Sequence, residues 1–270
     1  MLALAVITAL GFALRWRHDV TAPLLALASA FSLPLAYLAA QSWSRSSRMG
    51  LFAAIFMAFM PAAIHFGAIS IAHAAAPALV LWALWLATKD SLRVQPTSFV
   101  LLALMPACVV VLMGGAGHFV LRWPTFDSVW RSLSALTLAY RVGEMAAVLP
   151  ALIAASSLLG CIAARVIHQK EFAVKRSPLQ LRDLALPTLM IAFALIASAA
   201  FISPTAFDGA VMVVASPALV LLLAWSFEGL ILEPRAQLPS PSTPETQSQR
   251  YGLVAIAALA LLAVYWRAWF

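Results

Sequence analysis

Residues 50–88 read GLFAAIFMAFMPAAIHFGAISIAHAAAPALVLWALWLAT, a stretch without a single Asp, Glu, Lys or Arg. Similar runs fill most of the 270-residue chain, in which hydrophobic residues make up 64% and charged residues only 10%. A soluble domain is roughly half apolar and about a quarter charged. The composition therefore predicts that lipid is the solvent, and backbone exposed to lipid must satisfy its hydrogen bonds within helices.

The apolar runs predict an all-α fold, a polytopic bundle of about nine transmembrane helices. Residues 1–232 are expected to form the helical core. Residues 233–250 are rich in Pro, Ser and Thr and predict a cytoplasmic linker, which leads to a C-terminal transmembrane helix in residues 251–270. The predicted spans are 1–15, 20–41, 50–66, 72–88, 98–120, 144–166, 184–202, 210–231 and 251–269.

The basic residues predict the orientation of the bundle. With residues 42–49 in the cytoplasm, eleven Lys and Arg fall on the inner side and six on the outer side. This asymmetry follows the positive-inside rule. It places the N-terminus in the cytoplasm and the C-terminus outside. Arg15 and Arg17 oppose it, because they then lie in the first outer loop.

Small residues in the central runs predict close helix packing. Ala54, Ala58, Ala62 and Gly67 recur at near-helical spacing, and small residues allow helix backbones to approach closely. We therefore expect residues 50–66 and 72–88 to pack as a tight antiparallel hairpin.

The remaining bulk features exclude several classes of protein. The net charge of +7 is carried mainly by short loops, which indicates topology and lipid headgroup contact rather than nucleic acid binding. Cys108 and Cys161 lie in apolar runs without CxxC spacing, so they are predicted to be small buried residues rather than a disulfide or metal site. The chain has no P-loop and no dinucleotide fingerprint.

One segment resembles a known family. Residues 24–90 read LLALASAFSLPLAYLAAQSWSRSSRMGLFAAIFMAFMPAAIHFGAISIAHAAAPALVLWALWLATKD. In this layout a helix leads to a short basic loop, a second helix ends at Pro61, a tight outer hairpin runs to about His73, and a third helix ends at Lys89. The pattern resembles the middle of the GT-C superfamily, which includes the protein mannosyltransferase and aminoarabinose transferase branches.

The resemblance implies where a catalytic residue would lie. Members of this superfamily use polyprenyl-phosphate sugars and carry a catalytic acid in a long first outer loop. Here the matching loop is only residues 15–19, and Asp19 is its single acid. The loop has no room for the family's interfacial helices.

If the chain is such an enzyme, its chemistry is expected on the outer side. Imidazole and carboxylate groups gathered at one face could hold a divalent metal that stabilises a departing lipid phosphate. Polar residues also collect at membrane interfaces without any catalytic role, and this reading remains open. The candidates are Asp19 and Asp127 for catalysis; His65, His73, Arg122 and Arg131 for substrate binding; and His18, His73 and His118 for metal binding.

The sequence leaves three functions open. The first is a non-catalytic subunit or scaffold of a membrane complex, favoured by the short first loop. The second is a minimal glycosyltransferase that uses a polyprenyl-phosphate sugar, and the third is a small transporter or lipid-handling protein. We expect a bacterial inner-membrane location, contact with membrane lipids and a membrane-protein partner, and no nucleic acid. No cofactor is expected, apart from a divalent metal if the chain is catalytic.

Overall fold

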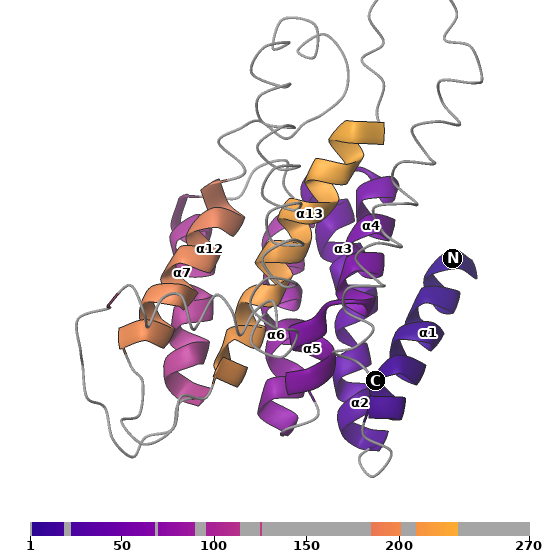
Figure 1. The fold of residues 1–270 in the computed structure, drawn as a ribbon. Helices are drawn as coiled ribbons and strands as arrows, with labels where there is room; N and C mark the ends of the chain where they lie inside the picture. The colour runs from indigo at the N-terminus through magenta and orange to yellow at the C-terminus, as the bar shows by residue number, and fades with distance from the viewer. Residues whose placement is uncertain are drawn as a thin grey trace, which may run out of the picture.

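The computed structural model describes residues 2–18, 23–67, 70–89, 96–113, 125, 185–200 and 209–231. Every regular element in these residues is helical, which confirms the all-α prediction for this part of the chain (Figure 1). The elements are α1 (Leu2–His18), α2 (Pro23–Ala30), α3 (Ser32–Ser44), α4 (Ser47–Ala58), α5 (Pro61–Phe66), α6 (Ile71–Thr88), α7 (Pro96–Met113), α12 (Ala185–Ala200), the 3-10 helix η2 (Gly209–Ala215) and α13 (Ser216–Ile231).

Two stretches of the described residues are long and apolar enough to cross a bilayer. They are Pro23–Ser44, which joins α2 and α3, and Ile71–Thr88, which is α6. The second matches the predicted span 72–88. The predicted spans 144–166 and 251–269 and the linker 233–250 lie outside the described residues, so the full bundle of about nine helices stays a prediction.

The first predicted boundary is wrong. Helix α1 continues to His18, so Arg15 lies in a helix rather than in the outer loop expected from residue 15 onward. The apolar run ends at Arg15, but the helix does not, because α1 packs against α2 and α4 and Arg15 itself forms hydrogen bonds to both. Packing of this kind stabilises helical turns that composition alone would end.

Two predictions for the next stretch are also wrong: a single span over residues 50–66, and a helix that ends at Pro61. Helix α4 ends at Ala58, and Pro61 begins a separate short helix, α5. Proline has no amide hydrogen and cannot donate to the carbonyl four residues before it. It is well suited to the first position of a helix, where it stands here. The predicted span 210–231 is likewise divided, between η2 and α13.

The small residues pack tightly, but not against the predicted partner. Ala54, Ala58, Ala62 and Gly67 are all buried. However, α4 packs mainly on α3, α13 and α1, whereas α6 packs mainly on α3 and α2. The expected α4–α6 hairpin is therefore wrong, because α3 occupies the position beside both helices.

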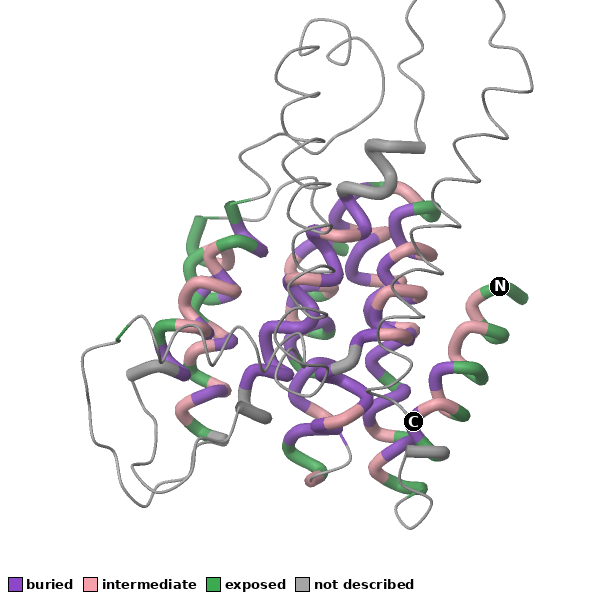
Figure 2. The backbone as a smooth tube through the Cα atoms, viewed as in Figure 1, coloured by how far each residue is buried: buried purple, intermediate pink, exposed green. Residues whose placement is uncertain are grey.

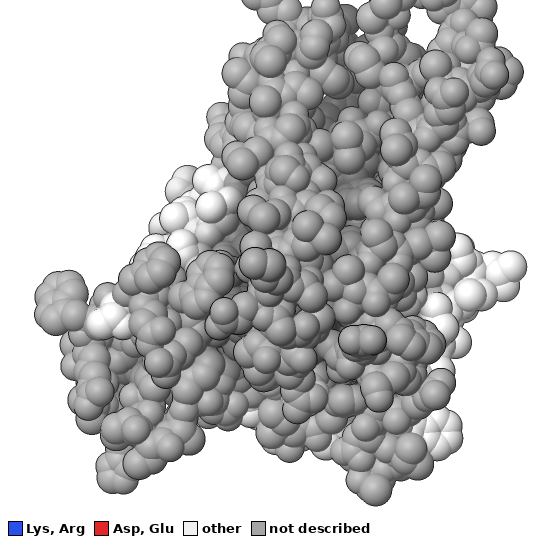
Figure 3. Space-filling model, viewed as in Figure 1, with Lys and Arg blue, Asp and Glu red and all other residues white. Residues whose placement is uncertain are grey.

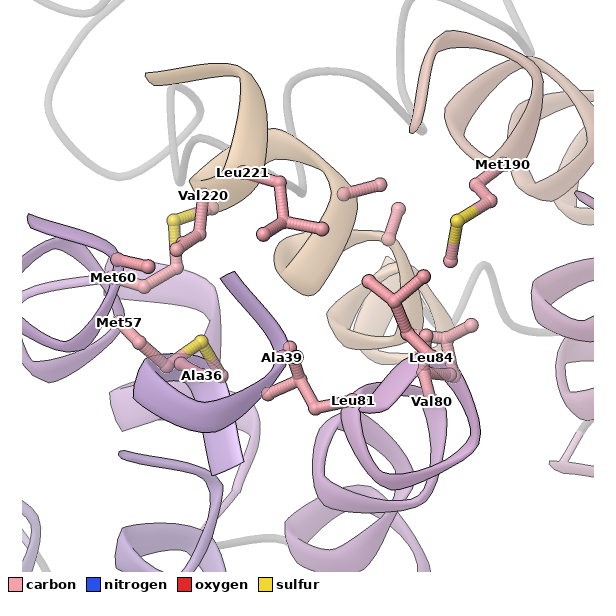
Figure 4. Close-up of a cluster of buried hydrophobic side chains, with 14 of the residues drawn as sticks. Ala36, Ala39, Met57, Met60, Val80, Leu81, Leu84, Met190, Val220 and Leu221 are labelled. Atoms are coloured by element: carbon pink, nitrogen blue, oxygen red, sulfur yellow. The ribbon is translucent and has the colours of Figure 1, made fainter. Parts of the chain in front are cut away.

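The core lies where α3, α4, α6 and α13 meet (Figure 4). Ala36 and Ala39 of α3 are fully buried and face the large side chains of the neighbouring helices. Met57 lies on one side of them and Leu81 on the other, and Val220 of α13 lies beside Met60 in the same cluster. Alanines on the central helix let its neighbours approach closely, which is how helices pack without a hydrophobic driving force in lipid.

Large apolar residues are also exposed, and exposed positions recur along the helices (Figure 2). On α7 the exposed row includes Cys108, so the prediction that this cysteine is buried is wrong. The exposed rows are Leu2, Val6 and Leu10 on α1; Leu24 and Leu27 on α2, continued by Phe31 at the start of α3; Leu79, Trp82 and Leu86 on α6; and Leu101, Leu104, Cys108 and Leu112 on α7.

The start of α4 offers a test of the fold. Ser46 is the N-cap, in extended conformation, and its Oγ accepts from the Met49 amide at 3.3 Å. We expect Ser46→Ala to lower the free energy of unfolding by about 0.5–2 kcal/mol. Ser47→Ala, at the exposed next position, should change it by less than about 0.5 kcal/mol. Denaturant titration of the purified protein in detergent measures both, and equal effects would contradict the assigned cap.

Candidate functional site

A buried arginine joins the first helix to the rest of the bundle. Arg15 is only 2% exposed. Its Nε donates to Ser29 Oγ at 2.9 Å, and its Nη2 donates to the Met57 carbonyl at 2.9 Å. Its Nη1 donates to the carbonyls of Gly11 at 3.0 Å and Ala58 at 3.3 Å. We call Arg15, Ser29, Met57 and Ala58 the Arg15 site.

The carbonyl acceptors exist because the helix breaks. The last four carbonyls of any α-helix lack their usual partners. At the end of α4 the proline at position 61 carries no amide hydrogen, so it cannot donate to Met57. The Met60 amide reaches the Met57 carbonyl only at 3.4 Å. The guanidinium therefore supplies hydrogen bonds that the broken helix cannot supply for itself.

Ser29 holds the site together from the other side. Its Oγ donates to the Ala63 carbonyl of α5 at 3.2 Å and accepts from Arg15 Nε. The Ser32 Oγ donates in turn to the Ser29 carbonyl at 2.6 Å. One hydroxyl thus connects α1, α2 and α5, and its proton is committed to α5, which leaves a lone pair for the arginine.

Two glycines permit this close approach. A Cβ at Gly67 would lie 2.8 Å from Ser29 Oγ and 2.5 Å from the Ala63 carbonyl oxygen. A Cβ at Gly11 would lie 3.2 Å from Arg15 Nη1 and would collide with Leu33. Any larger residue at either position would push apart the helices that carry the donors and acceptors of the Arg15 site.

All four acceptors of Arg15 are neutral oxygens. A buried guanidinium requires hydrogen bonds for its donors, since removing the charge from water is costly. Arg15 meets this requirement with one hydroxyl and three carbonyls, and the fork geometry of the guanidinium suits several acceptors at once. The arrangement can bind and orient a planar cation.

Two of the predicted substrate-binding residues, His65 and His73, lie on helices that pack on each other. His65 is half-buried in α5, with its ring 5.1 Å from that of Phe66. His73 is buried in the first turn of α6, and its Nδ1 lies 2.7 Å from the Oγ of Ser70, the N-cap of that helix. Because α5 and α6 pack on each other, both histidines belong to the same end of the bundle.

The other candidates are not placed. His18 ends α1, but its side chain lies outside the described residues. In the described ranges no three His, Cys, Asp or Glu side chains come together as a metal ion requires. The candidates wholly outside these ranges are Asp19, His118, Arg122, Asp127 and Arg131.

The opposite end of the bundle carries a second arginine on helix-end carbonyls. Arg45 caps α3 in the left-handed region, with φ 57°. Its Nη2 donates to the Thr88 carbonyl at 3.4 Å and its Nη1 to the Lys89 carbonyl at 3.5 Å. The Lys89 Nζ lies 5.8 Å from the centre of the Trp85 ring. The side chain of Arg45 thus links the α3–α4 connection to the end of α6.

Sequence reasoning missed the Arg15 site because it treated Arg15 as a loop charge. The sequence did hold a signal. Arg15 directly follows an apolar run and carries five N–H donors that need acceptors. Pro61 lies four residues after Met57 in another apolar run, so the Met57 carbonyl lacks its usual helical donor. What the sequence did not hold was the proximity of residues 42 and 43 positions apart.

Comparison with protein-family models, with curated proteins and with solved structures finds no match for this chain. The assignment of a function therefore rests on the residues and their geometry.

The Arg15 site predicts a large effect of conservative substitution. Arg15→Lys keeps the charge but loses the fork, so one ammonium cannot reach Ser29 and both carbonyls together. We expect Arg15→Lys and Arg15→Met each to lower the free energy of unfolding by about 2–5 kcal/mol.

The matched control is Arg48→Met, which removes an exposed arginine. It should change the free energy of unfolding by less than about 0.5 kcal/mol. Unfolding of the purified variants in one detergent compares them. If Arg15→Lys were as stable as the unmodified protein, the hydrogen bonds of the guanidinium group would not contribute to the free energy of unfolding.

Proposed function

We propose that this chain is an integral membrane protein with a GT-C-like helical layout, acting as a non-catalytic subunit or scaffold of a membrane complex. The observation that carries the proposal is the Arg15 site. Four of the five N–H donors of its buried guanidinium form hydrogen bonds that join α1, α2 and α4, and the Ser29 hydroxyl extends this network to α5. Hydrogen bonds that join helices in this way favour a structural role for Arg15.

The outward apolar rows support a location in the membrane. Rows on α1, α2, α6 and α7 leave large hydrophobic side chains exposed over much of the length of each helix. In the view of Figure 3 the few described atoms that are visible belong to neither acidic nor basic residues. Rows of exposed large apolar side chains favour contact with lipid or with other proteins. We propose a bacterial inner membrane as its location, with lipid and a partner protein sharing this surface.

The helix break also favours a structural role over transport. In transporters with discontinuous helices, the unwound carbonyls coordinate the coupling ion. Here the Met57 and Ala58 carbonyls are already hydrogen-bonded to Arg15. A solute would have to displace a side chain of the protein itself.

One observation favours the alternative of a minimal glycosyltransferase. Helix α5 and the start of α6 bring His65 and His73 to the end of the bundle where α1 terminates, just before Asp19 (Figure 1). In this alternative Asp19 and Asp127 carry the catalysis, with a polyprenyl-phosphate sugar as the donor. Asp19→Asn would then abolish transfer without lowering expression.

We expect the α3–α4 connection to be cytoplasmic. Helix α13 ends at the same end of the bundle as this connection, which supports the predicted placement of residues 42–49 and 233–250 on one side (Figure 1). After Cys108→Ala and Cys161→Ala, Ser47→Cys should be protected from an impermeant thiol reagent in intact cells. Ile71→Cys, exposed at the opposite end, should be labelled. The reverse pattern would invert the orientation.

Purification in mild detergent tests the proposed role. We expect a stoichiometric membrane-protein partner to co-purify with the chain, and Asp19→Asn to leave that assembly intact. The chain could instead purify as a monomer that transfers sugar from a polyprenyl-phosphate donor and loses this activity with Asp19→Asn. That result would refute the scaffold proposal and support the glycosyltransferase.

A further inference from the structure

We propose that the oxygens of Ser29, Met57 and Ala58 form a binding site for a guanidinium group, and that α1 docks on the bundle by inserting Arg15 into this site. The proposal goes beyond a framework role, because it assigns a ligand class to the break between α4 and α5. It does not depend on whether the chain is a subunit or an enzyme.

The site belongs to the part of the bundle that follows α1. Ser29 comes from α2, and Met57 and Ala58 come from the end of α4. The Ser29 hydroxyl is oriented by the Ala63 carbonyl of α5, so its position does not require Arg15. Only one of the four acceptors, the Gly11 carbonyl, belongs to α1 itself. Helices α2 and α4 therefore provide the acceptors, α5 orients one of them, and α1 supplies the ligand.

The geometry selects a planar cation with several donors. Each of the three guanidinium nitrogens of Arg15 is used, and Nη1 reaches two carbonyls from its two hydrogens. A compact ammonium or an alkali ion has no such fork. The acceptors include no carboxylate, so the hydrogen-bond directions rather than net charge define the ligand.

Arg15 acts as a tethered ligand. Only residues 19–22 separate α1 from α2. A short tether gives the side chain an effective concentration in the millimolar range or above, which a free ligand must exceed to compete. Removing the side chain should therefore open the site to added guanidinium, whereas the unmodified protein should ignore it.

Chemical rescue of Arg15→Ala in the full chain tests the proposal. Methylguanidinium chloride at up to about 20 mM, far below denaturing concentrations, should raise the melting temperature of the variant saturably by about 2–4 °C. The unmodified protein should show no rise. Sodium chloride and tetramethylammonium chloride at equal ionic strength should not reproduce the effect.

A second variant locates the bound cation. Arg15→Ala combined with Ser29→Ala removes the one side-chain acceptor, and its apparent Kd for methylguanidinium should rise at least about tenfold. Equal rescue of the single and double variants would overturn the site. A rise of the same size in the unmodified protein, or with sodium chloride, would show a general salt effect and would overturn it as well.

If Arg15→Ala cannot be purified in a folded state, recovery becomes the measurement. Extraction with methylguanidinium should then restore a monodisperse peak in size-exclusion chromatography for Arg15→Ala and for Arg15→Gln. Failure to restore either variant would refute the proposal. Co-purification of a partner is a separate observation, so the two proposals fail independently.

Discussion

A positive charge lies inside an apolar bundle because the helix break at Pro61 leaves backbone oxygens there short of good donors. In lipid an unsatisfied carbonyl is costly, and so is a charge without hydrogen bonds. The break between α4 and α5 leaves carbonyls that need donors, and Arg15 brings buried donors that need acceptors. The hydrogen bonds between them reduce both costs. The positions of α1, α2 and α5 all depend on this exchange, since each contributes a donor or acceptor or orients one.

Arginine on helix-end carbonyls recurs at the two ends of the described bundle. Arg15 binds the end of α4, and Arg45 binds the end of α6. The two differ in burial, because Arg15 is enclosed and Arg45 is exposed. Exposed hydrogen bonds compete with water and contribute little, whereas buried ones act in a low dielectric. We therefore expect the hydrogen bonds of Arg15 to stabilise the packing of the helices, and those of Arg45 to contribute little.

The burial of Arg15 bears on the charge conflict in the sequence. In the orientation that we propose, Arg15 and Arg17 lie toward the outer side, against the positive-inside rule. That rule concerns charges in loops near the membrane surface. Arg15 is a helical residue whose donors bind Ser29 and the carbonyls of α4. Its interactions with helices that come later in the sequence can balance the bias that its charge creates.

The sequence alone determined the helical class and several boundaries. Apolar runs such as residues 72–88 and 184–202 match α6 and α12 within one or two residues, because composition governs which segments prefer lipid. Proline at position 61 correctly marked a discontinuity. The direction of its effect was misread, since proline can begin a helix as well as end one. The GT-C-like layout stays a hypothesis, and so do Asp19 and Asp127 as catalytic residues.

Only the tertiary structure decided which helices touch and what Arg15 does. Small residues at Ala58 and Gly67 signalled close packing but could not name the partner, because an alanine face fits any neighbouring helix. The pairing of Arg15 with carbonyls 42 and 43 residues away likewise has no local pattern. Hydropathy reports the preference of each segment for lipid. It does not contain the geometry by which donors on one segment meet acceptors on another.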